Sequence, residues 1–320
     1  MSYVEELKNK ILDGYLINKD EALKLVDEDL DELTKAADEL RRHFCGNAFD
    51  MCTIISGKNG KCSENCKYCA QSAHYHTGAD VYPLMPTKPI LDQAKYNDSK
   101  GVSRYGVVTS GKRLSDAEVD QLCETLKTVR HECGINLCAS LGLISEENFR
   151  KLRAVGVTSI HNNLETSRNF FPKVCTTHSW DEKVETIKAA KRAGLSVCSG
   201  GIMGVGESME DRIDMALSLR ELDIKSVPVN FLCAIKGTPL ADNPRVTDEE
   251  ALRIIAIYRF ILPDAFIRLA GGRILLKDSG KRCFESGANA TITGDLLTTT
   301  GTTIDKDMQT MKELGYTVCR

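Results

Sequence analysis

The sequence contains no run of about 18 consecutive apolar residues, the length that a transmembrane helix needs. Its first residues form a mixed acidic and basic amphipathic segment without the apolar core of a secretory signal. Neither charge sign is in large excess, since 42 basic and 45 acidic side chains leave a formal net charge of −3. The charge balance argues against a polybasic surface for nucleic acid or anionic membranes. We therefore expect a cytoplasmic protein that binds neither nucleic acid nor a membrane.

Low-complexity linkers, internal sequence repeats and sharp changes of composition are also missing from the 320 residues. The first 43 residues show the apolar spacing of helices, and short β-rich segments separated by amphipathic helices follow. The predicted strands are 51–56, 104–110, 135–140, 158–163, 195–200, 226–232, 265–270 and 290–293. The predicted helices after residue 43 include 117–133, 146–154, 180–193, 209–222 and 248–260.

Strands that alternate with helices in this way predict an α/β fold, a (β/α)8 TIM-type barrel, rather than an open sheet. We expect residues 1–43 to form an N-terminal helical extension and residues 44–320 to form the barrel domain. In such barrels the active site lies at the carboxyl ends of the strands. Residues of chemical interest are therefore sought just after each predicted strand.

Thirteen cysteines are the unusual part of the composition. In a reducing compartment, clustered cysteines indicate metal ligands and scattered ones indicate small buried residues or redox groups. Cys62, Cys66 and Cys69 follow the first predicted strand, and the nearest further candidates are His74 and His76, which do not fit zinc-finger spacing. A structural zinc ion needs four ligands, whereas a 4Fe–4S cluster held by three cysteines leaves one iron open. The ligand count favours the cluster, with zinc or a chance grouping of thiols as the alternative.

This CxxxCxxC spacing, with an aromatic residue before the last cysteine, resembles the signature of the radical S-adenosylmethionine (SAM) superfamily. The resemblance implies that Cys62, Cys66 and Cys69 hold a 4Fe–4S cluster and that Tyr68 packs near the adenine of S-adenosylmethionine. In that superfamily the open iron binds S-adenosylmethionine, and one electron cleaves the sulfonium to give methionine and a 5′-deoxyadenosyl radical. That radical then abstracts hydrogen from the substrate.

Longer segments of the sequence resemble one particular family within this superfamily. In chain order they read CSENCKYCAQSA, HNNLETS, VCSGGIMGVGE, SVPVN, KGTPLADN, IRLAGGR and SGAN. The amino-acid sequences of these segments and their separations resemble the biotin synthase family from about residue 45 to residue 315. The resemblance implies conversion of dethiobiotin to biotin by insertion of sulfur between two unactivated carbons. It also implies an electron donor such as flavodoxin or ferredoxin, and a homodimer.

The same resemblance assigns roles to five residues near the ends of predicted strands. Asn163 is expected to bridge cofactor and substrate, Glu165 to hold the ribose hydroxyls, and Asn230 to contact the ureido ring of the substrate. Gly200 and Gly201 are expected to allow close backbone approach to the cofactor, although glycines also serve ordinary turns after strands. Capping of a loop or a surface position is the alternative for each polar residue. Their predicted places at strand ends favour the functional roles.

An auxiliary iron–sulfur cluster, 2Fe–2S in most biotin synthases, is implied as the sulfur source, held inside the barrel by three cysteines and an arginine. Cys138, Cys198 and Arg268 stand at three of the matching places. The fourth place is Gly106, which has no thiolate, so the chain resembles a variant that lacks one of the usual ligands.

Cys52 and Cys45 are the candidates to complete this ligand set. Neighbouring strands lie about 4.8 Å apart, so an inward thiolate on the first strand is close to the second. Up to four thiolates suit a cluster larger than 2Fe–2S and would make Arg268 a hydrogen-bond donor rather than a ligand. The alternative is that Cys45 and Cys52 are buried small residues. Burial without a chemical role is the prediction for the other cysteines: Cys123, Cys133, Cys175, Cys233, Cys283 and Cys319.

Two other functions remain open at this point. One is a neighbouring radical SAM enzyme, such as a hydrogenase maturase or methylornithine synthase, although the VCSGG and SVPVN segments favour biotin synthase. The other is a non-catalytic iron–sulfur or zinc-binding protein. Turnover of dethiobiotin separates the first from a biotin synthase, and analysis of metal and acid-labile sulfide separates the second.

Overall fold

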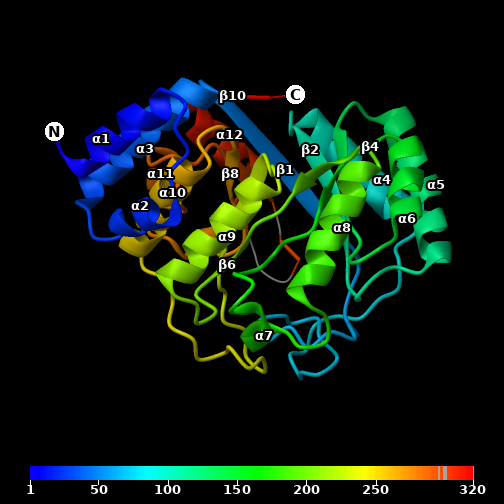
Figure 1. Cartoon of the computed structure of the whole chain (residues 1–320). Coiled ribbons are helices and arrows are strands. Elements are labelled where there is room, and N and C mark those ends of the chain that lie inside the picture. The colour runs from blue at the N-terminus through cyan, green and yellow to red at the C-terminus, as the bar shows by residue number, and fades with distance from the viewer. Residues whose placement is uncertain (295, 298–300, 320) are drawn as a thin grey trace.

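A closed barrel of parallel strands forms the centre of the structure (Figure 1). The computed structural model describes residues 1–294, 296–297 and 301–319. The strands follow the order β1-β2-β3-β4-β5-β7-β8-β9, and β9 pairs back with β1. The predicted (β/α)8 TIM-type barrel is therefore confirmed. Their bounds are β1 Ala48–Lys58, β2 Arg104–Thr109, β3 Asn136–Ser140, β4 Val157–His161, β5 Ser196–Cys198, β6 Gly201–Met203, β7 Ser226–Phe231, β8 Phe266–Leu269 and β9 Ala290–Ile292.

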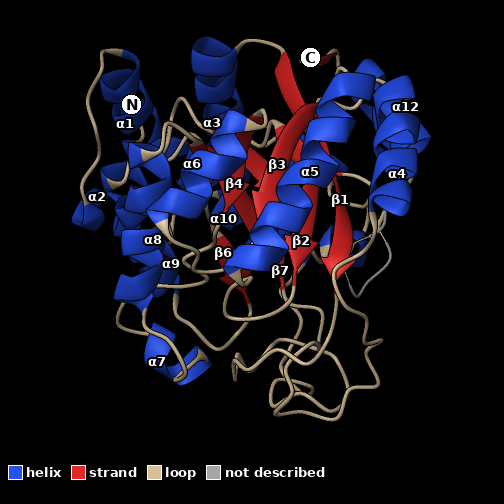
Figure 2. Ribbon diagram, turned by 90° about the vertical axis from the view of Figure 1, so that its right-hand side faces the viewer, coloured by secondary structure: helices blue, strands red, loops and turns tan. Residues whose placement is uncertain are grey.

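Helices surround the barrel, and long loops gather at one end of it (Figure 2). Several helices begin with a serine whose side chain accepts a hydrogen bond from the first turn, as Ser115 does from Glu118 N. Among the described residues, no helix is long and apolar enough to cross a membrane. The helices are α1 Tyr3–Leu12, α2 Lys19–Lys24, α3 Leu30–Cys45, α4 Thr87–Ser99, α5 Asp116–Glu132, α6 Glu146–Ala154, α7 Phe171–Val174, α8 Trp180–Arg192, α9 Met209–Glu221, α10 Asp248–Ile261, η1 Arg273–Leu275, α11 Lys281–Phe284 and α12 Ile304–Glu313.

The first three helices lie against one side of the barrel (Figure 1). Helix α3 packs on α10, and α2 packs on α9. Because α3 runs through Cys45, the predicted boundary after residue 43 falls inside this helix. The short strand β10, Thr317–Val318, pairs with the start of β1.

The predicted strand 195–200 corresponds to β5, which ends at Cys198; a further short strand, β6, begins at Gly201, and both pair with β7. Two glycines at the break allow very close backbone contacts. A Cβ atom on Gly200 would lie 1.9 Å from the carbonyl oxygen of Pro228, and one on Gly201 would lie 2.3 Å from that of Glu165. Glu165 pairs with Gly201 beyond the end of β4. Packing between neighbouring strands therefore requires glycine at both positions.

We expect the substitution Gly201→Ala to destabilise the chain by about 1–3 kcal/mol, the usual cost of overpacking. The added methyl group would also lie 2.5 Å from the sulfur of Met215, so the strand or α9 must shift. Urea unfolding measures the effect. Gly134→Ala is the control, because the nearest atoms to its Cβ would lie at 3.8 Å. Equal stability of the two variants would contradict the packing argument.

Candidate active site

A cavity of about 420 Å³ extends from the barrel interior to the loops that follow β1, β2, β3, β4 and β7. Many of the lining residues lie two positions apart on a strand, as the two-residue period of a strand requires. On β1 Cys52 and Ile54 line the cavity together with Thr53, and on β7 Ser226, Pro228 and Asn230 do so together with Phe231. The predicted placement of the site at the carboxyl ends of the strands agrees with this cavity.

The three cysteines of the CxxxCxxC segment all line the cavity and are half-buried. Backbone hydrogen bonds fold their loop back on itself. Cys62 N donates to Gln71 O at 2.9 Å, Ala73 N donates to Cys62 O at 2.8 Å, and Cys69 N donates to Cys66 O at 3.0 Å. Three thiols in one compact loop at a cavity wall match the donor set of a 4Fe–4S cluster with one open iron. The residues present therefore fit this cofactor.

Four more thiols line the same cavity: Cys52, Cys138 and Cys198 from three different strands, and Cys233 from the segment after β7. Arg268 donates from Nη1 to Cys52 Sγ at 3.2 Å and from Nη2 to Ser226 Oγ at 3.4 Å. The Ser226 hydroxyl in turn donates to Cys198 Sγ at 3.2 Å. We call Cys52, Cys138, Cys198 and Arg268 the inner group.

Buried charge around the inner group suits an anionic partner. Arg104 and Arg268 carry two positive charges against the single carboxylate of Asp50, which they contact at 3.1 and 3.2 Å. Within the described part of the chain, the buried Arg268 Nε has no hydrogen-bond partner. Three thiols, a net positive charge and an unused donor fit an iron–sulfur cluster.

Two thiols of the inner group, Cys52 and Cys198, differ in acidity. Burial raises the pKa of Cys52 to about 12, although Arg268 opposes the shift. Burial also acts on Cys198, but hydrogen bonding to His161 and the charge of Arg268 outweigh it and lower its pKa to about 7. Cys198 is therefore the easier of the two to deprotonate for metal binding. The contribution of His161 gave no signal in the sequence.

Comparisons with known proteins bear on these two sets of thiols. Residues 58–219 match the sequence profile described as the radical SAM superfamily, and residues 228–317 match the biotin and thiamin synthesis associated domain. The chain is 56% identical over 318 residues to the biotin synthase of Akkermansia muciniphila, with 99% of each chain covered. It is 55% identical to the biotin synthase of Brachyspira hyodysenteriae, with 98% of this chain and 95% of the relative covered.

The chain belongs to the biotin synthase family. Membership implies a 4Fe–4S cluster, S-adenosylmethionine and an auxiliary iron–sulfur cluster as cofactors. Among solved structures, methylornithine synthase has a TM-score of 0.85 at 21% identity, covering 98% of this chain and 97% of that one. A hydrogenase maturase also has a TM-score of 0.85, at 18% identity, covering 99% of this chain and 76% of that one. At such identities the two structures show a shared barrel fold and no more.

The polar residues that the biotin synthase resemblance assigned gather at the mouth of the cavity. Tyr68, Asn163, Glu165 and Asn230 all line it. Asn163 Nδ2 donates to Glu165 Oε2 at 3.3 Å. Burial raises the pKa of Tyr68, and Glu165, which forms a hydrogen bond with it, adds to the shift. Glu165 has a φ of 72°, a left-handed conformation that is unusual for a residue with a side chain.

Gly200 and Gly201 are not among the residues that line the cavity. Instead, Gly200 N donates to Asn163 Oδ1 at 3.0 Å, and Asn230 Nδ2 donates to Gly201 O at 3.0 Å. The close approach of these glycines to the cofactor stays a prediction. They pack against neighbouring strands and hold the two asparagine side chains in place.

Cys45 is also placed differently from the prediction. It ends α3, and its thiol lies 3.8 Å from Pro263 O and 3.9 Å from Ala265 O, at the amino end of β8. Arg259 Nη1 donates to the same sulfur at 3.4 Å. The cavity lining does not include Cys45. The structure therefore separates Cys45 from the inner group, because Cys45 precedes β1 on the outside of the barrel's amino end.

Strand register places Cys52 near Gly106 but not directly opposite it. Gly106 pairs with Ile54 on β1 and with Cys138 on β3, whereas Cys52 pairs with Arg104. A Cβ on Gly106 would lie 3.4 Å from Ile54 Cγ2 and 3.7 Å from Cys138 Cβ. Cys52 thus lies one inward position closer to the amino end of the barrel than the missing ligand.

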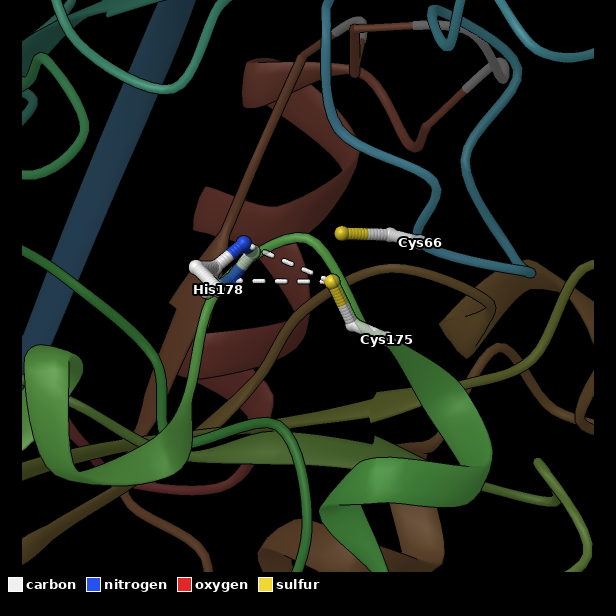
Figure 3. A group of neighbouring side chains, drawn as sticks. All are labelled: Cys66, Cys175 and His178. Atoms are coloured by element: carbon white, nitrogen blue, oxygen red, sulfur yellow. Dashed lines mark hydrogen bonds between the residues drawn. The ribbon is translucent and has the colours of Figure 1, made fainter.

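The largest departure from the sequence prediction concerns Cys175, which was expected to be a buried residue without a role. It is buried, but its thiol lies against Cys66 and His178 (Figure 3). The Cys175 sulfur is 3.4 Å from His178 Nδ1, and that nitrogen is 2.6 Å from Glu64 Oε2. The hydrogen bond with Cys66 and the His178 side chain lower the pKa of Cys175 to about 3. A C-x-x-H spacing in the sequence was the one signal that could have pointed to this group.

We expect Asp50→Asn to lower the free energy of unfolding of the cluster-free chain by about 3–5 kcal/mol. Burial alone would raise the pKa of Asp50, but Arg268 and Arg104 hold it below its usual value. Loss of the carboxylate charge leaves these two guanidinium groups without their anionic partner. Urea unfolding measures the change, with Asp264→Asn as control, because its ion pair with Lys225 is exposed. A loss for Asp50→Asn below about 1 kcal/mol, the range of exposed pairs, would contradict the assignment.

Proposed function

We propose that this chain converts dethiobiotin to biotin, with Cys62, Cys66 and Cys69 holding the 4Fe–4S cluster and Cys52, Cys138 and Cys198 holding the auxiliary cluster. One observation carries the proposal: two separate sets of three thiols line a single cavity. The two cofactor sites and a substrate between them could then share one enclosed space. Together the cofactors supply hydrogen abstraction from unactivated C–H bonds and the sulfur atom that is inserted.

The walls of the cavity support the binding of a largely apolar substrate. The apolar side chains of Ile54, Val108, Pro228 and Ile292 line the cavity within the barrel. No side-chain base can deprotonate an alkyl carbon, so the protein's contribution is to position the substrate and to exclude water and stray reductants.

The polar mouth of the cavity supplies orientation. The Asn230 amide donates to Gly201 O and accepts from Gly271 N at 2.9 Å, so its side chain is held rigidly. It keeps one N–H and one lone pair for a ligand. Asn163 is held in the same way by Gly200 and Glu165. We assign Asn163 to both cofactor and substrate, Asn230 to the substrate, and Glu165 and Tyr68 to S-adenosylmethionine.

The proposal includes a cytoplasmic location, a homodimer and an external electron donor of the flavodoxin or ferredoxin type. All thirteen cysteines are free, which suits a reducing compartment. The dimer and the donor rest on the family resemblance alone. Sedimentation analysis tests the first, and reduction by each purified donor tests the second.

Anaerobic reconstitution tests the proposed function. Iron and acid-labile sulfide are counted on the reconstituted chain, and biotin is measured after incubation with dethiobiotin, S-adenosylmethionine and a reductant. We expect two clusters per chain and biotin formation, unchanged in a Cys123→Ser control on α5. Zinc without sulfide would overturn the proposal in favour of a metal-binding protein. Cleavage of S-adenosylmethionine without biotin would favour another radical SAM enzyme.

A further inference from the structure

Cys66, Cys175 and His178 place three potential metal ligands around one point, although only Cys66 belongs to the CxxxCxxC segment. Each offers one ligand atom, and these atoms lie within 4.8 Å of one another. Their side chains point toward each other from two segments far apart in the sequence, the loop after β1 and the loop after α7 (Figure 3). We call these three residues the Cys–Cys–His group.

The dimensions of this group match a single ion rather than a cluster. A tetrahedral zinc ion with Zn–S near 2.3 Å and Zn–N near 2.0 Å holds its sulfur and nitrogen ligands about 3.5 Å apart and its two sulfurs about 3.8 Å apart. The Cys175 sulfur is 3.4 Å from His178 Nδ1 and 4.0 Å from Nε2. Shifts of about 1 Å or less would complete the geometry, given the 4.8 Å limit on all pairs.

A buried carboxylate contacts the imidazole of His178, as a carboxylate does for the histidine ligand in many zinc sites. Glu64 Oε2 is 2.6 Å from His178 Nδ1, and the two side chains are 8% and 6% exposed. A carboxylate can only accept, so this contact keeps the proton on Nδ1 and leaves Nε2 with a free lone pair. Thr177 Oγ1 donates to the same carboxylate oxygen at 2.8 Å and fixes its position. Cys66, Glu64 and His178 line the cavity, which gives an ion a route inward and a water as fourth ligand.

We propose that the Cys–Cys–His group binds one thiophilic divalent cation, such as Zn²⁺ or Fe²⁺, in the chain that lacks its 4Fe–4S cluster. The ion binds Cys66 Sγ, Cys175 Sγ and His178 Nε2, and Glu64 orients the imidazole. The two thiols lose their protons to solvent as they bind the ion as thiolates, and no redox step is involved.

One consequence rests on the proposed function. Since Cys66 is also assigned to the 4Fe–4S cluster, an ion in the Cys–Cys–His group withdraws that thiolate from the cluster ligands. Zn²⁺ therefore slows assembly of the 4Fe–4S cluster in the parent chain. An Fe²⁺ ion bound in the same place instead lies next to Cys62, Cys66 and Cys69 and can serve as the first iron of the cluster.

Titration of the cluster-free full-length chain with Co²⁺ under anaerobic conditions tests the site directly. Tetrahedral cobalt shows ligand-field bands, and each thiolate adds sulfur-to-cobalt charge transfer. We expect one Co²⁺ per chain with the charge transfer of two thiolates, displaced by Zn²⁺. Cys175→Ser and Cys175→Ala should remove about half of the charge transfer and weaken binding by at least roughly 10-fold, the low end of what loss of an outer-shell partner costs. Glu64→Gln should weaken binding while the charge transfer stays.

Cys62→Ser and Cys69→Ser are the matched controls, because they alter the CxxxCxxC segment and leave the Cys–Cys–His group intact. Both should bind Co²⁺ like the parent. Binding that depends on Cys62 and Cys69 but not on Cys175 would overturn the proposal, as would the absence of stoichiometric binding. Circular dichroism melting of each variant identifies any loss caused by misfolding, and the two Cys175 variants must agree.

A second measurement separates this proposal from the proposed function. Iron incorporation is followed with and without one equivalent of Zn²⁺, in the parent and in Cys175→Ser. Inhibition in the parent that disappears in the variant supports both assignments of Cys66. Two-thiolate cobalt binding without any effect of Zn²⁺ on cluster assembly would keep the cation site and overturn the role of Cys66 in the cluster.

Discussion

Replacement of Cys66 by alanine is expected to abolish cleavage of S-adenosylmethionine. The two thiols that remain in the segment, Cys62 and Cys69, cannot hold a 4Fe–4S cluster with one open iron. All three line the same cavity wall, and the backbone hydrogen bond from Cys69 N to Cys66 O at 3.0 Å sets their loop. The measurement is 5′-deoxyadenosine formed by the anaerobically reconstituted variant, together with its iron content.

Cys175→Ser is the matched control for this experiment. Cys175 is a buried thiol in contact with Cys66, but it lies outside the CxxxCxxC segment. We expect it to retain the cluster and to form 5′-deoxyadenosine. If Cys66→Ala still produced 5′-deoxyadenosine at the parent rate, the assignment of Cys62, Cys66 and Cys69 as the cluster ligands would be wrong. If Cys175→Ser lost the cluster as completely as Cys66→Ala, Cys175 would have to be counted as a cluster ligand.

Replacement of Cys52 by alanine is expected to remove the auxiliary cluster and biotin formation while cleavage of S-adenosylmethionine continues. Cys52, Cys138 and Cys198 are the cysteines of the inner group, and Gly106 supplies no ligand in their neighbourhood. Burial raises the pKa of the Cys52 thiol to about 12 even with Arg268 opposing the shift, so this sulfur becomes a thiolate near neutral pH only when a metal binds it. Visible and Mössbauer spectra of the reconstituted variant, read beside the biotin yield, measure the outcome.

Two substitutions serve as controls for Cys52. Cys45→Ser alters the other cysteine considered for this site, which the structure places beside Pro263 O and Arg259. Gly106→Ala adds a methyl group at ordinary contact distances, 3.4 Å from Ile54 and 3.7 Å from Cys138. Both should keep the second cluster. An unchanged second cluster and full biotin yield in Cys52→Ala would reduce Cys52 to a packing residue.

The order of strands and helices was predictable because it depends on local patterns. Alternation along each strand and capping residues at helix starts are properties of short segments, and the barrel follows from their sequence along the chain. The strand predicted over 195–200 ends at Cys198, and another begins at Gly201, because Gly200 and Gly201 lie under the carbonyl groups of Pro228 and Glu165, which nothing local shows. The break there is decided by the neighbouring strand and by the segment after β4.

The sequence by itself determined the thiols of the CxxxCxxC segment, since three ligands from one short loop must lie together wherever that loop folds. It also determined the family, through several segments whose amino-acid sequences are specific to biotin synthases. Only the tertiary structure decided which distant cysteines meet. It placed Cys52 within the inner group, left Cys45 outside it, and brought Cys175 and His178 to Cys66 across more than a hundred residues of chain. Such meetings depend on strand register and on the path of loops between strands, and no local pattern specifies either.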